Sequence, residues 1–180
     1  MNNRIKSGKF IMSELKRIYS KFLRALILLL IFCLILPGCS KAQKEPESGG
    51  KIQINKSDPW KLNEVITPEN LSAELKNKNK PLIIQVGFKI LYDQNHIPGA
   101  VYTGPAYLEA GINALKDTLK NVNRDKSIVL YCGCCKWKDC PNIRPAFETV
   151  TGLGFKNVKV LYLEDTFVKN WIDKGYPTVK

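Results

Sequence analysis

Histidine is almost absent from this sequence, because His96 is the only one among 180 residues. A single histidine excludes histidine-based metal motifs and gives poor support to a Cys–His protease pair. His96 precedes Ile97-Pro98-Gly99, and in such a turn a structural hydrogen-bonding role is favoured over general-base catalysis. The sequence also lacks a phosphate-binding loop and a dinucleotide-binding fingerprint, so no cofactor is expected.

Acidic residues are also scarce. The chain has 16 Asp and Glu against 28 Lys and Arg, which gives a formal net charge of +12. Half of this excess lies in residues 1–38, and the other basic residues are scattered. No basic stripe with interleaved aromatic residues is present, so a nucleic acid is not an expected partner.

The apolar run at residues 25–36 is too short to cross a bilayer comfortably. It reads ALILLLIFCLIL, whereas a spanning helix needs about 20 residues. A short apolar core behind a basic leader is typical of a secretory signal peptide, which we expect at residues 1–38. Either Met1 or Met12 starts this leader.

The signal segment runs into a motif around Cys39. Residues 36–40 read LPGCS, which resembles a bacterial lipobox, where the cysteine is acylated and becomes N-terminal. Fatty acids such as palmitate on Cys39 would anchor the protein, since each buried CH₂ contributes about 0.8 kcal/mol. We therefore expect an exported lipoprotein of the bacterial cell envelope, held on the outer membrane or the outer face of the cytoplasmic membrane. The alternative is an uncleaved signal anchor with an ordinary thiol at Cys39.

A globular pattern begins only after a polar segment. Residues 39–58 contain mainly Lys, Gln, Glu, Pro, Ser and Gly, so they predict a flexible tether, followed by a folded domain at 59–180. Strands are expected at 81–86, 100–103, 127–132 and 157–163, with helices beginning near Pro68, covering 108–122, beginning near Asn142 and carrying Phe167 and Trp171. This alternation predicts an α/β domain with a central, mostly parallel sheet and helices on both faces.

The loop after the strand at 127–132 is dense in cysteine. Four cysteines fall within nine residues of a domain that has no others, namely Cys132, Cys134, Cys135 and Cys140. A domain of about 120 residues can bury an adequate core without disulfides, so stapling alone is a weak explanation. Sites in parallel sheets form at the carboxyl ends of strands, and Cys132 occupies such an end.

Positive charge is expected around Cys132. The next helix should begin near Asn142, because Pro145 is tolerated only in a first turn. Its N-terminus would then point back into the loop, where backbone N–H groups make an anion cradle. Lys136, Lys138 and Arg144 add charge, and all of these favour a thiolate at Cys132.

Several segments together resemble the rhodanese-like family of single-domain sulfurtransferases over residues 65–178. They are TPENL at 67–71, HIPGA at 96–100, the strand ending in Tyr131-Cys132, GFKNV at 154–158, and Trp171 with KGYP at 174–177. The resemblance implies a three-layer rhodanese fold. It also implies that Cys132 accepts sulfane sulfur as a persulfide, from a small sulfur-containing anion or persulfide donor, and passes it to a thiol acceptor.

The resemblance extends to the loop amides, and with the nearby positive charge we expect the substrate anion to be bound by Gly133, Cys134, Cys135, Lys136, Trp137, Lys138 and Arg144. The chain departs from the family in two places. Gln85-Val86-Gly87 replaces the usual Asp-Val-Arg triplet, and the loop is longer, with Trp137 where an arginine often stands.

The three additional cysteines leave alternatives open. Cys134, Cys135 or Cys140 could resolve a persulfide on Cys132, or the cluster could carry thiol–disulfide redox chemistry. A non-catalytic module that binds Cu(I) or Zn(II) through the four thiolates is a further alternative. The last is a rhodanese-like domain that only binds a partner.

Overall fold

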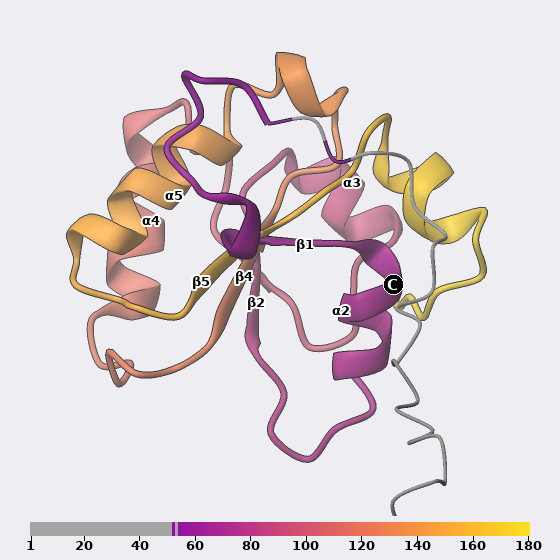
Figure 1. The fold of residues 1–180 in the computed structure, drawn as a ribbon, viewed down its shortest axis with the longest axis horizontal. Coiled ribbons are helices and arrows are strands. Elements are labelled where there is room, and N and C mark those ends of the chain that lie inside the picture. The colour runs from indigo at the N-terminus through magenta and orange to yellow at the C-terminus, as the bar shows by residue number, and fades with distance from the viewer. Residues whose placement is uncertain (1–51, 53) are drawn as a thin grey trace, which may run out of the picture. The chain divides into compact units, whose positions relative to one another are not determined.

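The computed structural model describes residue 52 and residues 54–180 (Figure 1). The expected signal peptide, the acylated Cys39 and most of the expected tether therefore lie outside the described residues. The described residues belong to one compact unit, Gly49–Lys180. Among them, no helix combines the length and apolar character that a membrane crossing requires.

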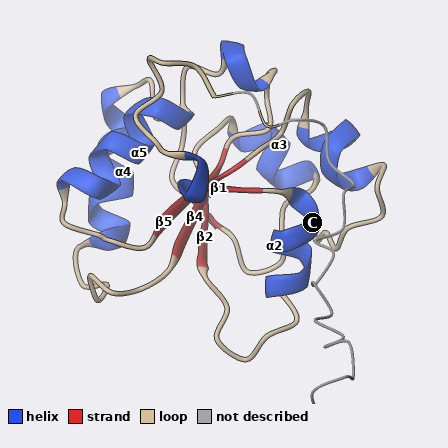
Figure 2. Ribbon diagram, viewed as in Figure 1, coloured by secondary structure: helices blue, strands red, loops and turns tan. Residues whose placement is uncertain are grey.

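The domain is built on a five-stranded parallel sheet (Figure 2). Its strands, in spatial order β1-β5-β4-β2-β3, are β1 (Val65–Ile66), β5 (Val158–Leu161), β4 (Ile128–Tyr131), β2 (Leu82–Gln85) and β3 (Val101–Tyr102). All four strand pairs are parallel, which confirms the predicted α/β fold class. β4 is the central strand, so the loop that follows it leaves from the middle of the sheet.

Helices cover both faces of this sheet (Figure 1). One face carries α4 (Glu109–Leu119) and α5 (Ile143–Gly152), and the other carries α2 (Pro68–Glu74) and the π-helix η3 (Val168–Ile172). The remaining elements are α3 (Lys89–Gln94) and two 3-10 helices, η1 (Leu62–Glu64) and η2 (Trp137–Asp139). This three-layer arrangement agrees with the expectation from sequence.

Successive residues of β4 enter opposite cores, as strand geometry requires. Ile128 and Leu130 pack with the α4–α5 layer, whereas Val129 and Tyr131 pack with the layer that contains Trp171. Cys132 continues this alternation and joins the α4–α5 core. The Cys132 side chain is therefore buried on the α4–α5 side of the sheet.

Local signals placed most helix starts correctly. The Thr67 hydroxyl accepts a hydrogen bond from the Asn70 N–H at 3.3 Å, and Pro68 opens α2. Pro145 lies in the first turn of α5, as expected. The helix expected at 108–122 is shorter: α4 begins after Leu108, which is its N-cap and is 44% exposed, and ends at Leu119. Leu115 and Leu119 of the expected apolar face are buried.

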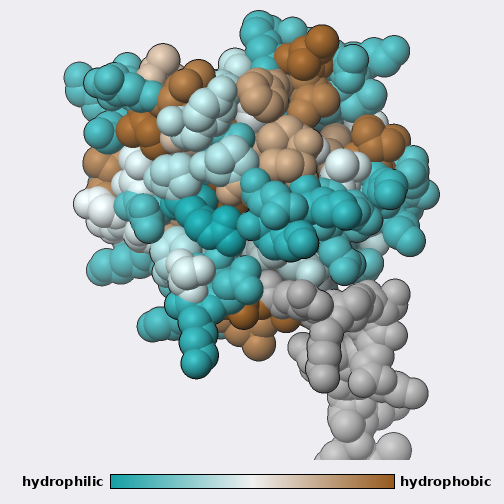
Figure 3. All heavy atoms as spheres, turned by 90° about the horizontal axis from the view of Figure 1, so that it is seen from above, coloured by the Kyte–Doolittle hydropathy of each residue, from teal (hydrophilic) through white to brown (hydrophobic). Residues whose placement is uncertain are grey.

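Packing begins before residue 59. The Asp58 carboxylate is fully covered and bonds to Arg144, and the Trp60 ring packs on Trp137 and Phe147. The last residues assigned to the tether are thus part of the folded domain. On the face seen in Figure 3, hydrophilic residues predominate and hydrophobic residues form small separate groups.

Candidate functional site

The cysteine loop turns sharply where it leaves β4. Gly133 has φ +81°, and a Cβ there would lie 2.6 Å from the Cβ of Phe167. Glycine is therefore required both by the backbone conformation and by the packing. The loop after β2 lies close to Cys132, since a Cβ on Gly87 would be 3.2 Å from the Cys132 sulfur.

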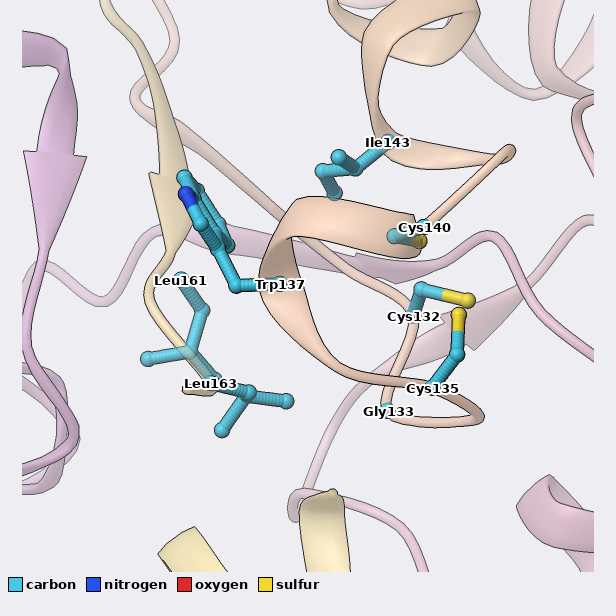
Figure 4. Close-up of a pocket in the computed structure, with 8 residues that line it drawn as sticks. All are labelled: Cys132, Gly133, Cys135, Trp137, Cys140, Ile143, Leu161 and Leu163. Carbon is cyan, nitrogen blue, oxygen red and sulfur yellow. The ribbon is translucent and has the colours of Figure 1, made fainter. Parts of the chain in front are cut away.

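The four loop cysteines converge, as their spacing suggested. The Sγ atom of Cys134 lies 3.1 Å from that of Cys132 and 3.2 Å from that of Cys135. The sulfurs of Cys132, Cys135 and Cys140 lie within 4.8 Å of one another, and Figure 4 shows the first two pointing together with Cys140 beside them. All four are free thiols, and Cys132 is only 5% exposed.

Asn142 contacts this cluster through its side chain, a role that the sequence analysis missed. Its Oδ1 accepts the backbone N–H of Tyr107 at 3.1 Å. Because a backbone N–H can only donate, this bond orients the amide and directs Nδ2 at the Cys132 sulfur, 3.3 Å away. Nδ2 also lies 3.9 Å from the Cys134 sulfur. From sequence, Asn142 signalled only the start of a helix.

Hydrogen bonding among the thiols separates their pKa values. Contacts with the thiols of Cys132 and Cys140 hold the pKa of Cys134 well below its usual range. The pKa of Cys132 is raised, first by its hydrogen bonds to Cys134 and Cys140 and then by burial. These directions favour ionisation of the half-buried Cys134 over ionisation of Cys132, where the thiolate is expected from sequence.

Alkylation should reveal this charge distribution. In the reduced protein we expect the rate at which iodoacetamide modifies Cys134 to stay nearly flat from pH 6 to pH 8, because the lowered pKa keeps the thiol ionised across this range. The rate for an ordinary thiol with a pKa of about 8.5 should rise by about 80-fold over the same range, and peptide mapping by mass spectrometry would measure both. A rate that falls tenfold per pH unit below 8 would contradict a lowered pKa at Cys134.

The basic residues of the loop divide into two groups. Lys136 and Lys138 are exposed. The Arg144 guanidinium instead bonds the Asp58 carboxylate at 2.6 and 2.9 Å, donates to the Cys140 carbonyl at 3.3 Å and lies over the Trp60 ring. Arg144 therefore holds the loop and the 54–60 segment together.

Loss of this bond network should destabilise the fold. We expect Arg144→Gln to lower the free energy of unfolding by about 2 kcal/mol, because Asp58 would remain buried without its charged partner. Lys159→Gln is a matched control, since its bond to Glu74 is part-exposed and should cost under about 1 kcal/mol. Urea denaturation would measure both. If Arg144→Gln left the free energy of unfolding unchanged but weakened binding of the sulfur donor, Arg144 would be assigned to the anion site.

Trp137 lies in the wall of the loop. It is buried between the rings of Trp60, at 5.1 Å, and Tyr162, at 5.0 Å between centroids. Its backbone N–H donates to the Glu164 carbonyl at 3.2 Å. Trp137 thus shapes the loop from the side remote from solvent.

Two small cavities border Cys132. One, of about 10 Å³, is lined by the cysteines 132, 135 and 140 together with Gly133, Trp137, Ile143, Leu161 and Leu163 (Figure 4); it has room for about one atom. The second, of about 50 Å³, borders Cys132, Gly133, Phe167 and three amide side chains, Gln85, Gln94 and Asn95. Gln85 is 2% exposed and its Oε1 has no hydrogen-bond partner, so it is available to a ligand donor.

His96 lies outside this site. Its Nδ1 is 2.9 Å from the Tyr92 carbonyl, its ring stacks on Tyr92, and its backbone pairs with Val179. These contacts join the HIPGA turn to the C-terminal segment. They agree with the structural role favoured from sequence.

Comparison with known proteins gives a family match. A family model described as the rhodanese-like domain matches residues 67–164. A rhodanese-like domain from Anabaena sp. is similar at 20% identity and a TM-score of 0.48, covering 64% of this chain and 78% of that one. A rhodanese-like domain protein from Staphylococcus aureus is similar at 17% identity and a TM-score of 0.42, covering 65% and 99%. No curated protein matches. The match over residues 67–164, with a cysteine loop at the carboxyl end of the central strand, establishes that the chain belongs to the rhodanese-like domain family.

Proposed function

We propose that this protein is a sulfurtransferase that carries sulfane sulfur as a persulfide on Cys132. One observation carries the proposal: Cys132 ends the central strand with its sulfur 3.1 Å from Cys134 and 3.3 Å from the Asn142 amide. A buried nucleophile thus has a second sulfur and a hydrogen-bond donor in contact with it. Membership of a sulfurtransferase-like family supports this assignment.

The first half-reaction transfers one sulfur atom to Cys132. The Cys132 sulfur attacks the outer sulfur of a donor persulfide, R–S–SH. The bond between the two donor sulfurs breaks, and the leaving RS⁻ takes up the proton that Cys132 loses. The products are the Cys132 persulfide and RSH, so no oxidant or reductant is consumed. The small cavity lined by Cys132 and Leu163 has room for one added sulfur atom.

The second half-reaction passes the sulfur onward. An acceptor thiolate attacks the outer sulfur of the Cys132 persulfide, the bond within the persulfide breaks, and Cys132 is regenerated. Loop amides from Gly133 to Lys136, with the charges of Lys136 and Lys138, would stabilise negative charge on the sulfurs.

The cavity beside Gln85 favours an organic persulfide over thiosulfate as the donor. Its lining contains no charged residue, and Gln85 offers a buried acceptor. A dianion would lose its hydration there without a cationic partner. A small persulfide with an N–H or O–H group would instead satisfy Gln85.

Mass spectrometry tests the proposal directly. The reduced protein would be exposed separately to glutathione persulfide, inorganic polysulfide and thiosulfate, then digested under acid conditions. We expect a gain of one sulfur atom on the peptide that contains Cys132, greatest with glutathione persulfide. No gain with any donor, or a gain that persists in Cys132→Ser, would contradict the assignment.

Thiol–disulfide exchange is the second candidate, favoured by the 3.1 Å separation of the Cys132 and Cys134 sulfurs. Here both thiols are oxidised to a disulfide while an external disulfide is reduced to two thiols. Equilibration with glutathione buffers, followed by counting of free thiols, would give the reduction potential. A fully reduced cluster in every buffer would eliminate this candidate.

We further propose that the protein acts at a membrane surface through a lipid on Cys39. The lipobox-like sequence LPGCS supports this, and the domain would then face an exported compartment. Metabolic labelling with a palmitate analogue should mark the wild type and not Cys39→Ser, which should also leave the membrane fraction. An unlabelled wild type would contradict the anchor.

A further inference from the structure

We propose that Cys132, Cys135 and Cys140 form a binding site for a single Cu(I) ion. Their three sulfurs lie within 4.8 Å of one another. The centre of a triangle with sides of that length lies about 2.8 Å from each corner, so a contraction of about 0.5 Å per sulfur would give thiolate–metal bonds of about 2.3 Å. The cluster is thus close to a closed three-coordinate site.

The donor set identifies the kind of ion. All three candidate ligands are soft sulfur atoms, and no histidine or carboxylate belongs to the group. Soft thiolates favour Cu(I) and Zn(II), but structural Zn(II) sites take four ligands in a tetrahedron. Three sulfurs that are mutually close suit trigonal Cu(I), and Cys134 is not part of that mutual set.

The surroundings suit a soft ion of low charge. Trp137, Ile143, Leu161 and Leu163 complete the wall of a cavity of about 10 Å³ beside the three sulfurs, which leaves space for about one atom. Binding would release three protons and leave a charge of −2 on the Cu(I) and its three thiolates. The Asn142 amide, which donates to Cys132, and the exposed Lys136 and Lys138 would offset this charge.

Copper binding would be a second capability of the same loop and does not rest on sulfur transfer. The two uses share Cys132, so a bound ion would block persulfide formation. Cys135 and Cys140 are metal ligands in this proposal, whereas Cys132 is also the nucleophile of sulfur transfer. Copper binding and sulfur uptake are therefore measured separately on the wild-type protein.

The test uses the full chain in its reduced, metal-free form without oxygen. Cu(I) is added as its acetonitrile complex, and a chromogenic Cu(I) chelator competes for the ion. We expect one ion per chain, and in Cys135→Ser and Cys140→Ser an affinity weaker by at least about 100-fold, which is more than the loss of a residue that only supports a metal ligand would cause. Cys39→Ser, outside the loop, should bind like the wild type. X-ray absorption of the wild type, which needs no variant to fold, should show three sulfur neighbours.

Several outcomes would overturn the copper site. One is an unchanged affinity of Cys140→Ser for Cu(I). Another is an X-ray absorption spectrum of the wild type that shows four sulfur neighbours, or nitrogen or oxygen neighbours. The third is displacement of the bound Cu(I) by equimolar Zn(II). The proposed sulfurtransferase activity is scored separately, because sulfur uptake on Cys132 is measured in the metal-free wild type. Copper binding without sulfur uptake would refute only the transferase, and sulfur uptake without copper binding would refute only the metal site.

Discussion

Cys132→Ser should abolish sulfur transfer from glutathione persulfide to a thiol acceptor, with a loss on the order of 10³-fold or more. The hydroxyl of serine would remain protonated at neutral pH and cannot hold a sulfane sulfur in a stable form. Because Cys132 is buried at the end of the central strand, no other thiol can take its place without rearranging the loop. Steady-state release of the acceptor persulfide measures the effect.

Cys140→Ser is the matched control for this prediction. It removes a buried thiol of the same loop, but leaves both Cys132 and the neighbouring sulfur of Cys134 in place. We expect it to retain persulfide formation on Cys132. If Cys132→Ser remained as active as the wild type while Cys140→Ser was inactive, the nucleophile would have been assigned to the wrong cysteine.

Asn142→Asp should slow sulfur transfer by about 10- to 100-fold, since a hydrogen bond to a charged group contributes about 1.5–3 kcal/mol and 1.4 kcal/mol corresponds to a factor of ten. The substitution keeps the acceptor for the Tyr107 N–H and removes only the donor directed at Cys132. Asn142 acts through Cys132, so it is a positioning residue. Its effect should appear in the rate constant for persulfide formation.

The pH profile separates this role from simple loss of structure. A carboxylate placed 3.3 Å from the Cys132 sulfur would repel a second negative charge and raise the pKa of the reacting thiols. The acid limb of the rate profile should therefore move to higher pH in Asn142→Asp, and in Asn142→Ala the rate should fall without so large a displacement. An unshifted acid limb in Asn142→Asp would remove Asn142 from the reaction.

Local patterns predicted the elements well where each signal is short-range. Thr67-Pro68 marks the start of α2 and Pro145 the first turn of α5, because capping and proline geometry depend on neighbours along the chain. The short apolar run at 127–132 predicted the buried β4. The helix predicted at 108–122 is shorter at both ends, because such boundaries depend on the adjoining loops and their packing rather than on the helical repeat.

Long-range contacts were beyond sequence reasoning. Arg144 was expected to bind an anion, but it pairs with Asp58, which lies 86 residues earlier. Asn142 received no chemical role, because its two partners, Tyr107 and Cys132, come from separate elements. The sequence does not show where a charged or amide side chain near a loop points. That orientation depends on which partners the fold places within hydrogen-bonding distance.

The cysteine loop shows where the two kinds of information divide. The sequence by itself determined that four thiols follow a buried strand and precede a helix, because hydrophobic patterning places the loop at the carboxyl end of the sheet. Only the tertiary structure decided that the pKa of Cys134 is lowered, that Asn142 directs its amide at Cys132, and that three sulfurs lie within 4.8 Å of one another. Hydrogen bonds and pKa values depend on distances of a few ångströms between residues, and those distances are set by packing across the whole domain.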